Sequence, residues 1–228
     1  MTSRALFQAA IFDFDGVIAD SIPLHFEAFR RLFREEGLEL TMDDYRRRIN
    51  GLPRDRSIRA VLGDLPAERM QQLMDRKGRY VFELLDRRGL QPIPGSLEFV
   101  RALRSRGLRT AIASSSRTAR RFLEAIRPLD PPAALFDAIL EGDGIRAPKP
   151  DPEIFHLAAR ALGVVPERCL AFEDAATGVA AARSAGMRVV ALTTTDTSEA
   201  LRDADRVYAN FAEIDPDDIL RIGASDKP

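Results

Sequence analysis

Cysteine is nearly absent from this chain, which has one such residue, Cys169, among 228. A single cysteine cannot form an internal disulfide, so the disulfide-stabilised secreted domains are excluded and a reducing compartment is favoured. Cys169 lies in an apolar segment, and the chain has only two histidines that could activate a thiol. We therefore expect a buried structural thiol and not a nucleophile.

Long apolar runs and an excess of charge are also missing. No uninterrupted apolar stretch approaches the length of a membrane span, and none before Asp13 is long enough for a signal peptide. The formal net charge is −1, so nothing favours bulk electrostatic binding of nucleic acid or of an anionic membrane surface. We expect a cytoplasmic, monomeric protein that binds neither nucleic acid nor membrane.

What the chain does contain is the composition of an ordinary globular protein. Hydrophobic residues make up 45% and charged residues 30%, and the length suffices for a large core with a smaller companion. From Pro92 onward, strand-like and helical segments alternate, which is typical of a doubly wound parallel sheet. The expected strands are 109–113, 138–140, 169–172 and 189–192, and the expected helices are 96–106, 118–126, 152–162 and 178–185.

One further strand, near the N-terminus, belongs with this alternating part. Residues 9–12 are apolar and run into a turn, as in a strand buried on both faces of a parallel sheet. Residues 22–90, by contrast, read as amphipathic helices at about 25–36, 42–49, 54–62 and 67–87. We therefore predict an α/β fold with a Rossmann-like, doubly wound parallel sheet made by residues 1–21 and 91–228. Residues 22–90 form a helical domain inserted into it.

Two aspartates directly follow the first strand. Asp13 and Asp15 stand at its carboxyl end, where open α/β sheets bind their ligands. Bare carboxylates are costly there unless a cation or a reaction uses them. Phosphoryl transfer could use both, with one aspartate attacking phosphorus and the other handling the proton of the leaving or entering oxygen. Asp-x-Asp-Gly alone is also compatible with a turn or a calcium loop.

Three further polar sites follow at the ends of expected strands or before a helix. Ser114 opens a run of three serines, Lys149 lies between two prolines, and Glu173-Asp174 follows an apolar strand. Each has a simpler explanation, namely a helix cap, a solvated lysine and a solvated helix start. Together they are coherent, because Asp13 and the acidic pair offer the oxygen ligands that Mg²⁺ prefers. Ser114 and Lys149 can hold phosphoryl oxygens.

In this order the motifs resemble those of the haloacid dehalogenase superfamily, and the helical insertion resembles its C1 α-helical cap. The resemblance rests on Asp13-Phe14-Asp15-Gly16-Val17, Ser114, Lys149-Pro150 and Glu173-Asp174. It implies that Asp13 is the nucleophile that forms an aspartyl-phosphate and that Asp15 is the general acid/base. It implies that Ser114 and Lys149 stabilise the phosphoryl group. Mg²⁺ would be held by Asp13, the Asp15 backbone carbonyl and Asp174, with help from Glu173.

Within the superfamily the chain is most similar to the β-phosphoglucomutase-like branch and its sugar-phosphate phosphatase relatives. That likeness implies a hinge and first cap helix at His25, and a specificity loop over 51–57, with Ser57 at its end, from which Arg54 meets a distal phosphate. It implies sugar contacts from Lys77, with Arg76 as the alternative register. The implied second grip on the substrate comes from Ser115, Ser116 and Arg117.

Two departures bear on the reaction. Thr118 stands where the mutases commonly carry Asn, and Pro53 stiffens the specificity loop. We therefore expect a Mg²⁺-dependent phosphatase acting on a small phosphorylated metabolite, a sugar phosphate, with β-phosphoglucomutase as the alternative. A receiver-type signalling module places its acidic pair and acceptor in a different order. Haloalkanoate dehalogenation would leave Asp15 and the acidic pair without a role.

Overall fold

A computed structural model describes residues 6–50, 52–126 and 132–222. The chain divides into two compact units. The core unit comprises Met1–Asp20 and Gln91–Pro228, and the helical unit comprises Ser21–Leu90.

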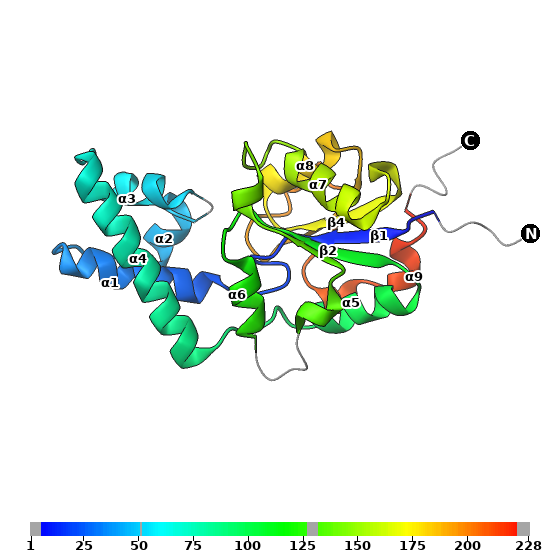
Figure 1. Ribbon diagram of the computed structural model, residues 1–228, viewed down its shortest axis with the longest axis horizontal. Coiled ribbons are helices and arrows are strands. Elements are labelled where there is room, and N and C mark those ends of the chain that lie inside the picture. Colours follow the sequence, from blue (N-terminus) through cyan, green and yellow to red (C-terminus); the bar gives the residue numbers. More distant parts are fainter. Residues whose placement is uncertain (1–5, 51, 127–131, 223–228) are drawn as a thin grey trace, which may run out of the picture. The chain divides into compact units, whose positions relative to one another are not determined.

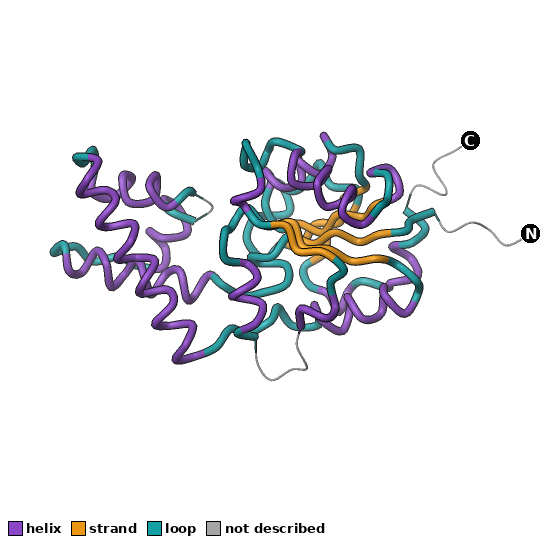
Figure 2. The backbone as a smooth tube through the Cα atoms, viewed as in Figure 1, coloured by secondary structure: helices purple, strands orange, loops and turns teal. Residues whose placement is uncertain are grey.

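The core unit is built on a six-stranded parallel sheet (Figure 2). The strands are β1 (Ala9–Phe12), β2 (Arg109–Ala113), β3 (Ala138–Leu140), β4 (Cys169–Glu173), β5 (Arg188–Leu192) and β6 (Arg206–Tyr208), in the order β3-β2-β1-β4-β5-β6. The chain runs outward from β1 through β2 to β3 and then returns to the other side of β1 at β4. The topological switch point therefore lies between β1 and β4, where folds of this kind bind ligands.

The register brings the ends of the central strands level. Phe12, the last residue of β1, is paired with Ile112 of β2 and with Phe172 of β4. Because the three strands are parallel, the residues that follow them emerge together at one edge of the sheet. This edge is where the sequence predicts its polar motifs.

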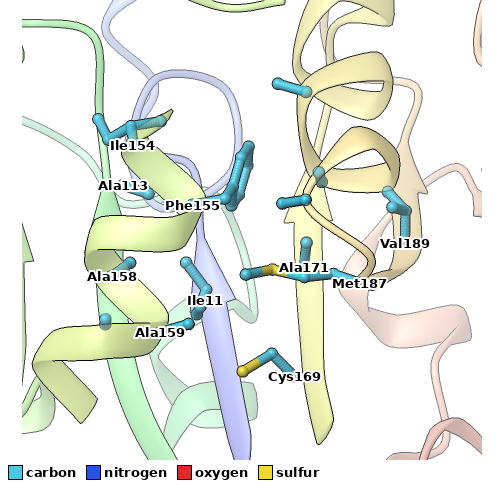
Figure 3. Packing of buried hydrophobic residues seen from close by; sticks show 14 of the residues in the cluster. Ile11, Ala113, Ile154, Phe155, Ala158, Ala159, Cys169, Ala171, Met187 and Val189 are labelled. Carbon is cyan, nitrogen blue, oxygen red and sulfur yellow. The ribbon is translucent and has the colours of Figure 1, made fainter. Parts of the chain in front are cut away.

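Helices cover both faces of this sheet. Figure 1 shows α7 (Glu153–Leu162) and α8 (Ala176–Ser184) on one face and α5 (Ser96–Ser105) and α9 (Pro216–Ile219) on the other, with α6 (Ala119–Glu124) following β2. Since successive side chains of a strand point to opposite faces, β1 packs against both layers. Its fully buried Ile11 lies under α7 in the cluster of Figure 3. Its Phe12 stacks on Phe172 with ring centroids 4.6 Å apart.

The helical unit consists of four helices, α1 (Ile22–Glu35), α2 (Met42–Arg48), α3 (Arg54–Leu62) and α4 (Ala67–Arg88), within the part of the chain that is described. α1 packs along α4, and Leu32 and Leu73 are fully buried in this small core. Thr41 begins α2, because its hydroxyl oxygen accepts a bond from the Asp44 amide at 3.1 Å. Gly63 ends α3 with φ at 75°, a conformation that suits glycine.

The α/β fold predicted from the sequence is confirmed, including the helical segment inserted after β1. The strand β6 was not predicted, because its three residues, Arg206, Val207 and Tyr208, are an exposed or half-buried sheet edge without an apolar run. Cys169 is fully buried in β4, as expected, and burial raises the pKa of its thiol to about 12. Among the described residues, no helix is both long and apolar enough to cross a membrane.

Candidate active site

Asp13 lies immediately beyond β1, and its backbone amide continues the sheet by donating to the Phe172 carbonyl at 2.9 Å. Gly16 then turns the chain with φ at 81°. A Cβ on Gly16 would lie 1.8 Å from Oδ2 of Asp174, so only glycine allows the two loops to approach this closely. Asp15 is half-buried within the same turn.

Lys149 joins the first and last of the predicted motifs. Its Nζ donates to Oδ1 of Asp13 at 2.5 Å, to Oε1 of Glu173 at 2.5 Å and to the Ala113 carbonyl at 3.0 Å. Its side chain is 8% exposed. Burial alone would lower the pKa of Lys149, but the two carboxylates outweigh it and hold the pKa above its usual value. The lysine is therefore a fixed positive charge at the carboxyl edge of the sheet.

Three carboxyl groups surround this charge. Oxygen atoms of Asp13, Glu173 and Asp174 lie within 4.8 Å of one another, and the latter two residues are almost completely buried. Burial raises the pKa of Glu173 to about 7, although Lys149 opposes the shift. Burial and the neighbouring carboxylates also raise the pKa of Asp174 well above its usual value. One lysine does not neutralise three carboxylates, and their hard oxygen donors fit Mg²⁺.

Ser114 directly follows β2 and is 1% exposed. Its backbone amide donates to the Leu140 carbonyl at 3.1 Å, and its Oγ accepts a bond from the Ser116 amide at 3.1 Å. Within the described part of the chain, the Ser114 hydroxyl donates no hydrogen bond. The serine is thus held rigidly while its own proton stays available to an incoming oxygen.

The rest of the serine run is tied to its own loop. Ser116 Oγ lies 3.0 Å from the Thr118 hydroxyl and accepts from the Thr118 amide at 3.3 Å. The Ser116 carbonyl accepts a bond from Gly142 at 2.9 Å. Ser115 and Arg117 are exposed. The core unit therefore brings Asp13, Ser114, Lys149, Glu173 and Asp174 close together, whereas substrate contacts by Ser115, Ser116 and Arg117 stay predictions.

In the helical unit, the structure distinguishes Arg76 from Lys77. Arg76 forms ion pairs with Glu35 at 3.3 Å and Glu36 at 3.1 Å. Lys77 is 3% exposed, and its Nζ lies 2.7 Å from Nδ1 of His25. Lys77, the register that we expected, is therefore the residue that shares a polar cluster with His25.

The charges near His25 fix its state. Burial, followed by the positive charges of Lys77 and Arg54, holds the pKa of His25 well below its usual value. With Lys77 charged, the short contact assigns Nδ1 of the neutral imidazole as the acceptor and Nε2 as the position of the ring proton. His25 is therefore a neutral hydrogen-bond donor.

The predicted specificity loop is described except for Gly51, which lies outside the described residues. Arg54 begins α3, is exposed, and donates from NH1 to the Met74 carbonyl of α4 at 3.1 Å. Ser57 is buried, and its hydroxyl donates to the Pro53 carbonyl at 3.0 Å. These bonds connect the loop to α4 and to its own backbone, and the substrate contacts of Arg54 and Ser57 stay predictions.

Sequence reasoning missed one set of residues at this edge. Thr194 follows β5, and its hydroxyl lies 2.6 Å from the Gly16 carbonyl oxygen and 3.3 Å from Oδ2 of Asp174. Nearby, Asp196 accepts a bond from the Ala176 amide at 2.8 Å. The strand-end rule that selected the other motifs would have selected this threonine too, because it stands two residues beyond β5.

Comparison with known proteins agrees with this geometry. The model of the haloacid dehalogenase-like hydrolase family matches residues 7–186. A phosphorylated carbohydrates phosphatase of Thermotoga maritima is 34% identical over 221 residues, which cover 94% of this chain and 97% of that protein. A beta-phosphoglucomutase of Bacillus subtilis is 35% identical over 193 residues, which cover 80% of this chain and 82% of that enzyme.

The fold of this chain is also similar to that of a solved structure. The crystal structure of CbbY from Rhodobacter sphaeroides in complex with phosphate has a TM-score of 0.78 and 28% identity, covering 91% of this chain and 96% of that one. The match of the family model and the extent of these alignments identify the chain as an enzyme that belongs to the haloacid dehalogenase-like hydrolase family.

Proposed function

We propose that the protein is a Mg²⁺-dependent phosphatase that hydrolyses small phosphorylated sugars through an aspartyl-phosphate on Asp13. The observation that carries the proposal is the contact of Asp13 with Lys149 at 2.5 Å, inside a cluster with the carboxylates of Glu173 and Asp174. The phosphorylated carbohydrates phosphatase of Thermotoga maritima supports the substrate class.

The first half-reaction uses Asp13 and Asp15. An oxygen of the Asp13 carboxylate attacks phosphorus, and the bond between phosphorus and the sugar oxygen breaks as Asp15 protonates that oxygen. Lys149 holds Asp13 in one orientation and, with the free hydroxyl proton of Ser114, stabilises charge on the phosphoryl oxygens. The sugar then leaves with its hydroxyl restored.

The second half-reaction reverses these roles. Asp15 accepts a proton from water, the water oxygen attacks phosphorus, and the acyl–phosphate bond to Asp13 breaks to release inorganic phosphate. Mg²⁺ would be held by Asp13, the Asp15 backbone carbonyl, Glu173 and Asp174, and it supplies positive charge to the transferred phosphoryl group. Their all-oxygen donor set supports this assignment.

The helical unit, residues 21–90, is proposed to act as the cap that selects the substrate. Lys77 and the neutral His25 offer hydrogen-bond donors suited to sugar hydroxyls. Arg54 offers a positive charge for a second anionic group of the substrate. A cytoplasmic location and a monomeric state stay predictions.

β-Phosphoglucomutase activity is the second candidate. It is favoured by the Bacillus subtilis relative and differs from hydrolysis only in what receives the phosphoryl group from Asp13. Hydrolysis is preferred here because the Thr118 hydroxyl stands where the mutases commonly carry an amide, and it lies 3.0 Å from Ser116 Oγ. We expect this loop to bind a bisphosphate intermediate weakly, so that water reaches the aspartyl-phosphate.

A time course by ³¹P NMR on β-glucose 1-phosphate, beside a panel of other sugar phosphates, separates the two. Inorganic phosphate as the main product, with no stimulation by glucose 1,6-bisphosphate, supports the phosphatase. Glucose 6-phosphate that accumulates only when the bisphosphate is added would overturn it in favour of the mutase. The Asp13→Asn variant is the control, and it should produce neither compound.

A further inference from the structure

The loop that follows β5 contacts two of the predicted motifs without belonging to either. Thr194 reaches the turn after β1 through the Gly16 carbonyl at 2.6 Å. It reaches the loop after β4 through Oδ2 of Asp174 at 3.3 Å. The half-buried Thr194 hydroxyl therefore lies between the two loops that supply the proposed metal ligands, beside the Thr195 hydroxyl, which bonds to Asp174.

A threonine hydroxyl has one proton to donate, and Thr194 shares it between two acceptors. The Gly16 carbonyl is the nearer acceptor, at 2.6 Å, and Oδ2 of Asp174 is the second, at 3.3 Å, so the hydroxyl bonds strongly to Gly16 and weakly to Asp174. The Gly16 amide donates to the Ala19 carbonyl at 2.8 Å, so both polar backbone groups of Gly16 are fixed. Because the Asp15 carbonyl shares a planar peptide unit with the Gly16 amide, its direction is fixed as well.

The turn after β1 and the loop after β4 are in close contact at Gly16. Gly16 has no side chain, and the Asp174 carboxylate occupies the position that a Cβ would take, at 1.8 Å. Asp196 fixes the backbone of the loop after β4. Its amide donates to the Asp174 carbonyl at 3.1 Å, and its carboxylate accepts a bond from the Ala176 amide at 2.8 Å. A small displacement of Gly16 would therefore move the Asp15 carbonyl relative to the Asp174 carboxylate.

We infer that Thr194 is a positioning residue for the divalent cation, acting through the Gly16 carbonyl and the Asp174 carboxylate. The inference rests on the proposed function, because it assumes that Asp174 and the Asp15 carbonyl are ligands. Groups that orient metal ligands typically change metal affinity by roughly 10- to 100-fold when they are removed. Loss of the Thr194 hydroxyl should weaken Mg²⁺ binding by that factor.

The test is calorimetric titration of the full-length protein with MgCl₂ alone. Thr194→Val keeps the shape of the side chain and removes the hydroxyl, and it should weaken Mg²⁺ binding roughly tenfold or more. Thr194→Ser restores the hydroxyl and should bind Mg²⁺ within about threefold of the wild type. Thr194→Ala is a second deletion variant and should match Thr194→Val, so the test survives if the valine does not fold.

Thr193→Val is the matched control. Thr193 is the adjacent residue and is also half-buried, and its hydroxyl bonds to no other residue in the part of the chain that is described. The control should bind Mg²⁺ like the wild type. The circular dichroism spectrum of Thr194→Val should match that of the wild type, which a general disruption of the fold would not allow.

Two results overturn the inference. One is wild-type Mg²⁺ affinity in folded Thr194→Val or Thr194→Ala, and the other is equal weakening in Thr194→Ser. The variant Asp174→Asn distinguishes an error about Thr194 from an error about the proposed metal site. If Asp174→Asn loses Mg²⁺ binding while Thr194→Val keeps it, only the role of Thr194 is wrong. If Asp174→Asn also binds Mg²⁺ like the wild type, the proposed metal site is wrong.

Discussion

Replacing Lys149 by methionine removes the only ammonium group among the described residues that contacts the carboxylate cluster. Its Nζ donates to Asp13 and to Glu173, each at 2.5 Å, and the side chain is 8% exposed. A hydrogen bond to a charged group contributes about 1.5–3 kcal/mol net. Two such bonds place the gross loss at about 3–6 kcal/mol.

The net cost should fall at the lower end of that range. Glu173 can relieve the repulsion by taking up a proton, because burial already raises its pKa to about 7. Removing one partner of a buried ion pair typically costs about 3–5 kcal/mol. We therefore expect Lys149→Met to lower the free energy of unfolding by about 3 kcal/mol at pH 8 without Mg²⁺. The loss should be smaller at pH 6, where protonation is easier.

The assay is urea unfolding in EDTA and again in saturating Mg²⁺. Bound Mg²⁺ supplies positive charge to the same carboxylates. The difference in free energy of unfolding between Lys149→Met and the wild type should therefore be smaller in Mg²⁺ than in EDTA. Arg146→Met is the matched control, since Arg146 is paired with Glu153 at the surface and its side chain is 93% exposed. That control should unfold like the wild type. A Lys149→Met protein within about 1 kcal/mol of the wild type in EDTA would contradict the reasoning.

Three further predictions separate roles within the site and the helical unit. Asp15→Ala should keep its affinity for Mg²⁺, because the backbone carbonyl of residue 15 survives, while kcat falls by roughly 10²–10⁴-fold. An equal loss of Mg²⁺ affinity in Asp15→Ala and Asp174→Ala would contradict the separate roles of the two side chains. Arg54→Ala should raise KM for the best sugar phosphate but leave p-nitrophenyl phosphate hydrolysis unchanged, whereas a parallel loss on both would indicate a structural role. His25 has a lowered pKa, so below the ordinary histidine pKa of about 6.5 the unfolded chain binds a proton that the folded chain does not. Stability should therefore fall as the pH drops below that value, by at most about 1.4 kcal/mol per pH unit. Urea unfolding of His25→Asn should show a shallower fall of stability with decreasing pH, and a fall as steep as that of the wild type would contradict this role of His25.

The sequence predicted the centre of the sheet well, for a simple physical reason. Strands β1 and β4 are buried on both faces, and all their residues except Glu173, the last of β4, are apolar, so the run is easy to read. The polar residues at their carboxyl ends, Asp13 just after β1 and Glu173 as the last residue of β4, then had to meet at one edge of a parallel sheet. The edge strand β6 lacks this constraint and was missed.

Other features depend on geometry that no pattern specifies. Arg76 and Lys77 are neighbours on one helix, and only the rotation of α4 directs Lys77 to His25 and Arg76 to the two glutamates at the end of α1. Thr194 was missed for a related reason. Its place after β5 satisfies the strand-end rule, but hydroxyl residues are common there, and only the contacts with Gly16 and Asp174 distinguish it from the others.

The most direct test of the account is to trap the phosphoryl group on the protein. A rapid acid quench during turnover of a sugar phosphate, followed by peptide mass spectrometry, should place one phosphoryl group on Asp13. Asp13→Asn should show no phosphorylated peptide and lose at least roughly a thousandfold in kcat, since a covalent nucleophile is removed. A phosphoryl group on a different residue, or an Asp13→Asn enzyme that keeps more than about a tenth of its turnover, would contradict the aspartyl-phosphate mechanism.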